Sequence, residues 1–570
     1  MKKHALAIAM TAALLSGCSA MSSSHNNTES TPYTLKSGGE IAPYQKGLSV
    51  SHARLNFSFD FAHEVLFGDT TLTLNSDNPQ THLSVDLDTR FTITSVWLNG
   101  KPLTAGEYRN EQGELIVESN TVITYPATLR IVYQGHPRTP VRAPWDGGVM
   151  WEQTPDGEPW LATAVQGEGC DLFWPCIDQP FGEPATADIF ITVPDNLVAA
   201  ANGVLTDTTE NGDSKTWHWH TRSMHNTYGI ALNIAPYEIL EDNFTSIYGN
   251  TIPLVYYHLK GNDDKARALF NELPGMITFF ERMIGPYPFA DEKAGIVQTP
   301  HLGMEHQTIN AYGNDYKKDE TGYDWLMQHE FSHEWFGNQL TNDNWDHMWL
   351  HEGLGSYMQP LYAQYLNGDL SYFALLNNQR KGLINEYPIV NNKLMSEEDV
   401  YESGPAGDIY AKGSLIMHTL RYLIGDEAFF RAVTTTVYGR PDPAPGNFKP
   451  VFADTQTFID NINAATDTNM DWFFDVYLYH APLPELITTR DDNGVTFTWN
   501  TENDLPFPMP LDVSIDGKVA TIDMVKTRRV PAHPKDTVIA DPHSKVLRYE
   551  QRYEDFKAWK AEQAEKEETK

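Results

Sequence analysis

The chain contains few cysteines and few basic residues. Its 570 residues include 3 cysteines, too few for a disulfide scaffold, which a chain of this size does not need. Lys and Arg number 41 against 76 Asp and Glu, so the formal net charge is -35. Because cationic side chains supply most of the affinity for a phosphate backbone, this balance argues against nucleic-acid binding.

Glycine and proline are also too scarce for a fibrous protein, with 39 and 35 residues. Hydrophobic residues make up 41% of the chain and aromatic residues 12%, which is too apolar for a disordered protein. The composition therefore indicates a globular protein. Since single domains typically hold about 100 to 200 residues, we expect three or four domains.

The N-terminus lacks an apolar run long enough to span a bilayer. Lys2 and Lys3 precede an apolar stretch, Ala5 to Leu15, that is too short for a membrane helix, so residues 1–18 are interpreted as an export signal. The signal ends in Leu15-Ser16-Gly17-Cys18, which resembles a bacterial lipobox, and we expect Cys18 to carry a lipid anchor. The alternative is a plain secretory signal with a chance cysteine. Ser19, rather than Asp, favours the outer membrane, with the protein facing the periplasm.

Hydropathy patterns divide the rest of the chain. Residues 19–39 are rich in Ser, Thr, Asn and Gly and predict a flexible tether. Residues 40–240 show period-two alternation, as in Leu55, Phe57 and Phe59, and a hairpin signal at Asn99-Gly100, so this region is predicted to be all-β.

The period changes to that of a helix beyond Asn262. Apolar residues from Ala266 to Met283 fit one helix face, with Pro274 as a kink, and residues 241–480 are predicted to be mainly helical. Short alternating runs return in residues 481–550, which predict a small β domain. Residues 551–570 form a charged tail, expected to be a solvated or frayed helix.

The most informative residues are His329-Glu330-Phe331-Ser332-His333, which fall in a helix predicted to run from about Trp325 to Phe336. Residues at i and i+4 share a helix face, so both imidazoles can reach one zinc ion. Glu352 follows on a second predicted helix. Two neutral imidazoles and one carboxylate leave a coordination position open for water, which is typical of a catalytic zinc site rather than a structural one.

The neighbouring charged groups have different predicted roles. Glu330 projects beside the histidine pair and is predicted to take a proton from the metal-activated water. His347 and His351 lack the one-face spacing and are interpreted as structural. Glu334 and Asp346 are alternative acceptors for the ring N–H of a metal-bound histidine.

The run HEFSHEWFGNQLTNDNWDHMWLHEG resembles the zinc aminopeptidases of the aminopeptidase N and leukotriene hydrolase type, gluzincins in which a glutamate ligand follows the HExxH motif after eighteen residues. The resemblance extends over nearly the whole mature chain. It implies one zinc ion, held by His329, His333 and Glu352, with Glu330 as the catalytic base.

A second motif resembles the exopeptidase motif Gly-x-Met-Glu-Asn of this family. It implies that Gly303, Met304 and Glu305 bind substrate, with Glu305 holding the free α-amino group. The sequence departs from the motif at Leu302, where glycine is usual, and at His306, where asparagine is usual.

Two further segments resemble family motifs. Tyr410 opens a segment similar to the Tyr-x-Lys-Gly motif, whose tyrosine stabilises the oxyanion of the transition state. Gln166 lies at the position of the residue that shares the substrate amino group with Glu305. Nearby, Cys170 and Cys176 could form a disulfide, but their spacing does not decide this.

The resemblance implies a multidomain α+β fold. It comprises an N-terminal saddle-like β domain, a thermolysin-like and mainly helical catalytic domain, and a small β-sandwich. The C-terminal helical domain of many relatives is not expected in the residues that remain, so we expect the cleft to be more open or to be closed by a partner subunit.

The resemblance also implies an exported, lipid-anchored zinc aminopeptidase acting on peptides with a free N-terminus. Three alternatives remain at this point. A thermolysin-like endopeptidase shares the zinc ligands, but Glu305 and Gln166 argue against it. Epoxide hydrolysis of a lipid would need a second tyrosine where Pro405 stands. A non-catalytic peptide-binding lipoprotein would be expected to have lost a ligand or the base.

Overall fold

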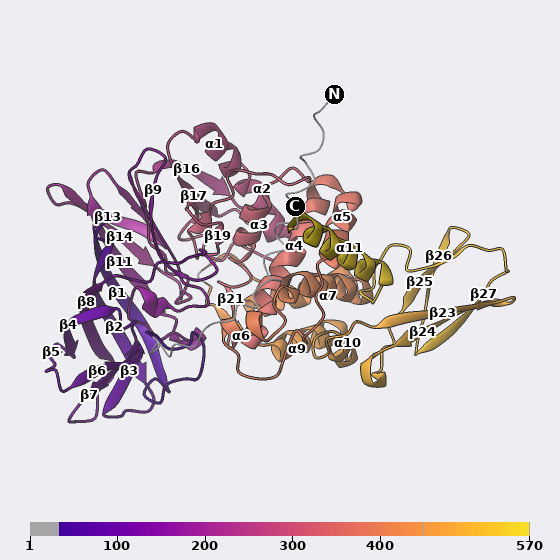
Figure 1. Cartoon of the computed structure of the whole chain (residues 1–570), viewed down its shortest axis with the longest axis horizontal. Coiled ribbons are helices and arrows are strands. Elements are labelled where there is room, and N and C mark those ends of the chain that lie inside the picture. The colour runs from indigo at the N-terminus through magenta and orange to yellow at the C-terminus, as the bar shows by residue number, and fades with distance from the viewer. Residues whose placement is uncertain (1–32, 447, 569–570) are drawn as a thin grey trace.

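The computed structural model describes residues 33–446 and 448–568, which form three units in a row along the molecule's long axis (Figure 1). A β domain lies at one end, a mainly helical domain in the middle, and a small β unit at the other end. This arrangement confirms the predicted α+β fold class. The export signal, Cys18 and most of the tether lie outside the described residues.

The N-terminal domain contains no α-helix in its described part. Its strands are β1 Leu48–Asp60, β2 Val65–Ser76, β3 His82–Asp86, β4 Phe91–Leu98, β5 Lys101–Pro102, β6 Tyr108–Glu111, β7 Glu114–Glu118, β8 Ala127–Gly135, β9 Gly148–Gln153, β10 Pro159–Ala164, β11 Ala187–Pro194, β12 Val198–Ala200, β13 Val204–Glu210, β14 Ser214–Thr221 and β15 Asn233–Ala235. They form an eight-stranded sheet of order β13-β14-β11-β1-β2-β8-β4-β5, a four-stranded sheet, β12-β15-β10-β9, and a three-stranded sheet, β3-β7-β6.

The alternation in β1 explains its place in the large sheet. Leu55 and Phe57 are buried, while Asn56 and Ser58 between them are partly exposed, as the period-two pattern predicts. Asn99 and Gly100 join β4 to β5 with positive φ at both residues, so the predicted hairpin is confirmed.

The middle domain combines a five-stranded sheet, β16-β17-β18-β20-β19, with most of the helices. Its strands are β16 Glu238–Thr245, β17 Thr251–His258, β18 Ala294–Gln298, β19 Gly303–Met304, β20 Asn310–Tyr312, β21 Leu340–Asn342 and β22 Val451–Ala453. Its helices are α1 Asp263–Phe270, α2 Leu273–Met283, α3 Trp325–Ser332, α4 Trp349–Asn367, α5 Asp369–Arg380, α6 Glu397–Glu402, α7 Asp408–Ile424, α8 Asp426–Tyr438, α9 Thr455–Thr466 and α10 Asp471–Tyr477.

Two helix predictions need correction. The segment from Ala266 to Met283 forms two helices rather than one. The helix α1 ends at Phe270, with Asn271 as its C-cap, and Pro274 lies in the first turn of α2 rather than at a kink inside a helix. The helix predicted to reach Phe336 ends at Ser332, although His333 keeps helical dihedral angles as its C-cap.

The last unit consists of two three-stranded sheets, β23-β24-β27 and β26-β25-β28. Its elements are β23 Glu485–Asp491, β24 Gly494–Asn500, β25 Leu511–Ile515, β26 Lys518–Ile522, β27 Thr527–Pro531, β28 Val538–Ala540 and the final helix α11 Gln551–Glu568. The first turn of α11 contacts the middle domain, since the Tyr553 hydroxyl donates to Asn377 Oδ1 of α5 at 2.9 Å. The predicted tail is therefore a helix anchored at its beginning.

Buried hydrogen bonds join the N-terminal and middle domains. The Asn202 amide nitrogen donates to the carbonyl oxygens of Gly229 and Gln307, each at 2.8 Å, and its oxygen accepts from Ala231 N at 2.8 Å. Gly203 N donates to Thr308 Oγ1 at 2.8 Å. Since Gln307 and Thr308 follow Glu305 closely, these bonds fix the middle domain's strand β19 relative to the β domain.

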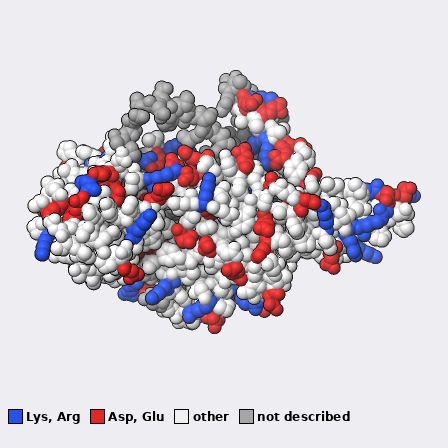
Figure 2. All heavy atoms as spheres, turned by 90° about the horizontal axis from the view of Figure 1, so that it is seen from below, with Lys and Arg blue, Asp and Glu red and all other residues white. Residues whose placement is uncertain are grey.

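The described residues before β1 also pack against the N-terminal domain. Gly38 N donates to Asp178 O at 3.3 Å, and Thr34 Oγ1 donates to Asp171, so residues 33–39, which were assigned to the tether from composition, contact loops of the domain. No helix in the described part of the chain combines the length and apolar character that crossing a bilayer requires. Figure 2 shows acidic side chains in separate groups over one face, with basic side chains between them.

We predict that the Asn202→Ala substitution destabilises the protein by about 2–4 kcal/mol, because it leaves buried backbone groups without partners. Urea denaturation followed by tryptophan fluorescence measures this change. The exposed Asn196→Ala substitution in the same domain is the control and should change stability by no more than about 0.5 kcal/mol. Equal midpoints for the two variants would contradict a structural role for the Asn202 bonds.

Candidate metal centre

The structure brings His329, His333 and Glu352 together around one point. His329 lies in the last turn of α3, His333 caps that helix, and Glu352 lies in the first turn of α4. The two imidazole Nε2 atoms are 3.4 Å apart, and each is 3.5 Å from Glu352 Oε2. Asp324 caps the start of α3 by accepting from Met327 N at 3.1 Å, which fixes the helix that carries both histidines.

These three atoms fit a tetrahedral zinc ion. Bonds of about 2.0–2.1 Å in tetrahedral geometry separate ligand atoms by about 3.3–3.4 Å, close to the spacing observed. Glu352 Oε2 is buried without a hydrogen-bond partner among the described residues, as expected of an oxygen that binds a cation. Burial lowers the pKa of His329 to about 4, so its imidazole is neutral near pH 7 and can donate a lone pair.

The ligand orientation depends on a backbone carbonyl that the sequence did not indicate. His333 Nδ1 lies 2.7 Å from Phe336 O, so Nδ1 carries the proton and Nε2 faces the metal site. The predicted acceptors, Glu334 and Asp346, are wrong. Glu334 accepts from Thr308 N at 2.9 Å, and Asp346 caps a separate loop.

His347 and His351 contact other parts of the protein rather than the metal centre. His347 Nδ1 lies 3.0 Å from Thr455 Oγ1, and His351 Nε2 accepts from Asn342 N at 3.1 Å. Both histidines therefore make hydrogen bonds within the middle domain, in line with the structural role inferred for these two residues.

Glu330 lies against the strand that carries the exopeptidase motif. A Cβ atom at Gly303 would be 2.5 Å from Glu330 Oε1, so a larger residue at this position would displace the carboxylate. Carboxylate oxygens of Glu305 and Glu330 and an imidazole nitrogen of His333 all lie within 4.8 Å of one another. Burial, with Glu305 and Glu352 nearby, raises the pKa of Glu330 and makes it a stronger base than an exposed glutamate.

Glu305 is held by two side chains of the N-terminal domain. Gln166 Nε2 donates to Glu305 Oε1 at 2.7 Å, and the Tyr228 hydroxyl donates to the same oxygen at 3.0 Å. Gln166 and Glu305 were predicted to act together, whereas Tyr228 was missed because no local motif marks it. Gly303 and Met304 form β19, which pairs only with β20 among the described strands, so its other edge can accept an extended chain.

Tyr410 reaches the centre from the first turn of α7. Its hydroxyl is 2.8 Å from the hydroxyl of Tyr401, a residue of α6 that sequence reasoning also missed. Burial raises the pKa of Tyr410, which keeps the hydroxyl protonated near neutral pH and able to donate. The approach of α7 to α4 is close, because a Cβ at Gly413 would lie 2.8 Å from Gly353 Cα.

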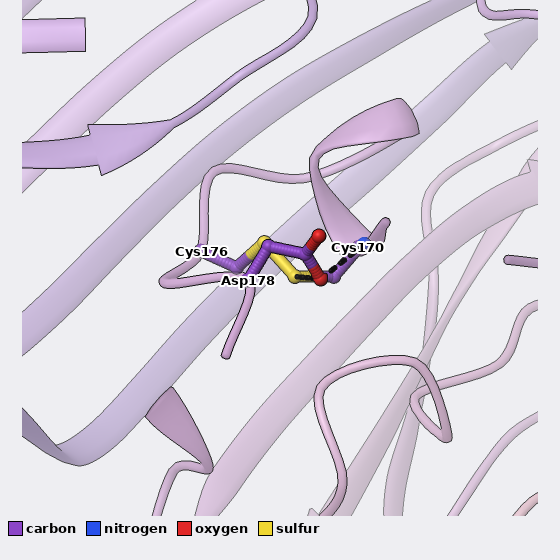
Figure 3. A group of neighbouring side chains, drawn as sticks. All are labelled: Cys170, Cys176 and Asp178. Carbon is purple, nitrogen blue, oxygen red and sulfur yellow. Dashed lines mark hydrogen bonds between the residues drawn. A yellow bond between two sulfur atoms is a disulfide. The ribbon is translucent and has the colours of Figure 1, made fainter. Parts of the chain in front are cut away.

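A disulfide supports the loop that carries Gln166. Cys170 and Cys176 are joined, with their Cα atoms 6.3 Å apart, which answers the question that their spacing left open (Figure 3). Asp178 Oδ1 accepts from Cys170 N at 3.3 Å beside this bond. Gly167 and Gly169 have φ of 79° and 113°, so the loop turns through conformations that favour glycine.

Family models match two parts of the chain. The model described as "Peptidase M1 N-terminal domain" matches residues 49–228, and the one described as "Peptidase family M1 domain" matches residues 302–477. The second match contains the three candidate metal ligands, Glu330 and Tyr410.

Similar proteins include two curated fungal relatives. "Leucine aminopeptidase 2" of Candida glabrata is 24% identical over 483 residues, which are 79% of this chain and 69% of the relative. "Aminopeptidase 2, mitochondrial" of Saccharomyces cerevisiae is 23% identical over 377 residues, 61% of this chain and 37% of the relative. The chain therefore spans little more than a third of the length of the second relative.

Among solved structures, a point mutant of an M1 zinc metallopeptidase of Deinococcus radiodurans, with a bound Tyr-Ser-Ala substrate, superimposes with a TM-score of 0.62. It is 23% identical, and the match covers 79% of this chain and 99% of that one. At this identity the likeness supports the fold.

We predict that the protein, stripped of metal by a chelator, takes up one zinc ion per chain. His329→Ala and Glu352→Ala should each weaken zinc binding by at least about 100-fold, because loss of even a supporting contact costs about 10- to 100-fold. Competition with a fluorescent zinc chelator measures the affinity. The His347→Ala substitution is the control and should retain full affinity; an equal loss in this variant would contradict the assignment of ligands.

Proposed function

The chain belongs to peptidase family M1, and from that premise we propose that it is a zinc-dependent aminopeptidase that removes residues one at a time from peptides with a free N-terminus. The observation that carries the proposal is the pairing of Gln166 and Tyr228 with Glu305, next to Glu330 and the three candidate ligands. A buried carboxylate held in this way suits a substrate ammonium group.

The anchor favours an exopeptidase over a thermolysin-like endopeptidase. Glu305 is 4% exposed, so an uncharged peptide continuing past this point would leave its carboxylate buried without a counter-charge. An ammonium group at Glu305 supplies that charge and fixes the distance from the chain end to the metal centre. The peptide backbone can extend from there along the open edge of β19.

The three candidate ligands, Glu330 and Tyr410 have separate roles in the proposed reaction. His329, His333 and Glu352 would hold a zinc ion, which when bound would supply a Lewis acid that lowers the pKa of a water molecule and polarises the scissile carbonyl. Glu330 takes the proton from that water and passes it to the leaving amine. The Tyr410 hydroxyl donates to the carbonyl oxygen as negative charge develops there, a contribution worth about 10²- to 10³-fold in rate.

The proposal is tested with one peptide in two forms, with a free and with an acetylated N-terminus. We expect stepwise release of N-terminal residues from the free form alone, abolished by chelation and restored by zinc. Acetylation removes the ammonium group and should slow cleavage by at least about 10- to 100-fold. Equal cleavage of both forms would indicate an endopeptidase and would contradict the proposal.

Two substitutions separate the roles within the same assay. Glu330→Gln should lower kcat by about 10²- to 10⁴-fold through loss of the base, with zinc content unchanged. Tyr410→Phe should lower kcat by about 10²- to 10³-fold. A Tyr410→Phe variant with full kcat would exclude the tyrosine from transition-state stabilisation.

We also propose that the protein is exported as a bacterial lipoprotein, anchored through Cys18 and facing the periplasm. The support is the sequence alone: Lys2 and Lys3, the short apolar run, and the Leu15-Ser16-Gly17-Cys18 motif. The described chain begins at Tyr33, whose carbonyl accepts from Thr89 N at 2.9 Å, and Cys18 lies before it in the sequence, outside the described residues.

Expression of the full chain in a Gram-negative bacterium tests the anchor. Mass spectrometry should detect acyl groups on an N-terminal Cys18, and the protein should fractionate with the outer membrane. The Cys18→Ala variant should lose the acyl mass and leave the membrane fraction. A wild-type chain recovered in the periplasm without acyl groups would contradict the proposal.

A further inference from the structure

The short helix α6 contacts both halves of the proposed site. A Cβ at Gly167 would lie 3.2 Å from the carboxyl carbon of Glu397, the first residue of α6. One helical turn later, the Tyr401 hydroxyl lies 2.8 Å from the Tyr410 hydroxyl. Residues 397 and 401 are i and i+4, so one face of α6 is turned toward the centre.

The position of α6 is well supported. Ser396 and Asp399 form a capping box at its start. On its other side, Lys36 Nζ lies 2.6 Å from Asp399 Oδ1 and 3.0 Å from Glu398 Oε2. The helix is thus held between the segment before β1 and the metal centre.

This placement makes α6 a wall beside the first residue of a substrate. If the α-amino group lies at Gln166 and Glu305 and the carbonyl at Tyr410, the side chain of that residue projects from a point between them. Glu397 contacts the loop at the amino-group end, next to Gln166, and Tyr401 contacts the carbonyl end. The first side chain therefore lies alongside the face of α6 that carries Glu397.

Glu397 has no counter-charge within the described protein. It is 6% exposed, and its Oε2 atom has no hydrogen-bond partner among the residues that the structure describes. The charges that act most strongly on its carboxyl group, those of Glu305, Glu352, Asp178 and Glu168, are negative and, with burial, raise its pKa. Lys36 is engaged by Glu398 and Asp399, and no described Lys or Arg forms an ion pair with Glu397. A buried carboxylate in such surroundings is costly unless a cation arrives with a ligand.

We propose that Glu397 binds the cationic side chain of an N-terminal arginine or lysine, and so sets a preference of the enzyme for basic first residues. Zinc and the substrate α-ammonium are used by Glu352 and Glu305, which leaves the carboxylate of Glu397 for a third positive charge. The inference rests on the aminopeptidase activity proposed above.

The test compares substrates that match in shape and differ in charge: aminoacyl-coumarin amides of arginine against citrulline, and of lysine against norleucine. The wild-type protein should hydrolyse the charged member of each pair with the higher kcat/KM. Glu397→Gln should lower kcat/KM for arginine and lysine by about 10- to 100-fold and change the citrulline and norleucine values by less than about threefold. Glu398→Gln, which removes a charge from the outer side of the same helix, should behave as wild type.

A binding measurement complements the kinetics. Calorimetric titration of the zinc-loaded protein should give tighter binding of L-arginine than of L-citrulline, with the difference lost in Glu397→Gln and kept in Glu397→Asp. Circular dichroism and zinc content verify that each variant is folded and loaded.

Several outcomes would overturn the inference. Equal kcat/KM for arginine and citrulline in the wild type would exclude a charge preference. An equal loss for all four substrates in Glu397→Gln would assign the residue to positioning of the loop or the amino group instead. Zinc-dependent release of leucine with no preference for basic residues would leave the aminopeptidase proposal standing and remove this one; no hydrolysis of any free-amine substrate would remove both.

Discussion

The geometry of the metal centre depends on the close crossing of helices α4 and α7. Gly353 follows the ligand Glu352, and Gly413 lies one turn after Tyr410; a Cβ at Gly413 would be only 2.8 Å from Gly353 Cα. Because neither residue has a side chain, the two helix backbones can touch, and Glu352 and Tyr410 reach the same small volume. Any larger residue at this crossing would separate the helices and with them a metal ligand from the proposed oxyanion donor.

The second organising feature is an excess of buried negative charge. Glu305, Glu330, Glu352 and Glu397 are each less than a tenth exposed, and burial is the main cause that raises the pKa of the last three. Buried carboxyl groups of this kind must be protonated or balanced by bound cations, and no Lys or Arg in the described part of the chain forms an ion pair with any of the four. A bound metal ion and a bound substrate ammonium group each supply positive charge to this cluster, so their binding stabilises the folded protein.

The site is also shared between domains. Gln166 and Tyr228 come from the β domain and Glu305 from the middle domain, and the buried bonds of Asn202 and Gly203 set the relative position of the two. The amino-group anchor is therefore a property of the interface, whereas the zinc ligands belong to the middle domain alone. We therefore expect a substitution at the domain interface to change substrate affinity without changing metal binding.

Local spacing was enough to predict much of this centre. His329, Glu330 and His333 are close in sequence, and helical periodicity alone places them on one side of α3; Glu305 and Tyr410 could be inferred from short motifs that resemble a known family.

Other features depended on contacts between distant segments. Tyr228 meets Glu305 across 77 positions and Gln166 meets it across 139, while α6, which carries Tyr401, contacts Lys36, far away in sequence. The carbonyl of Phe336 and the Cys170–Cys176 bond involve residues close in sequence and were not predicted for a different reason: they depend on where α3 ends, at Ser332, and on the path of a loop, neither of which residue spacing determines. The sequence by itself determined which side chains carry the chemistry, because residue type and helical period are local; only the tertiary structure decided their partners, because those contacts arise when whole helices and domains pack.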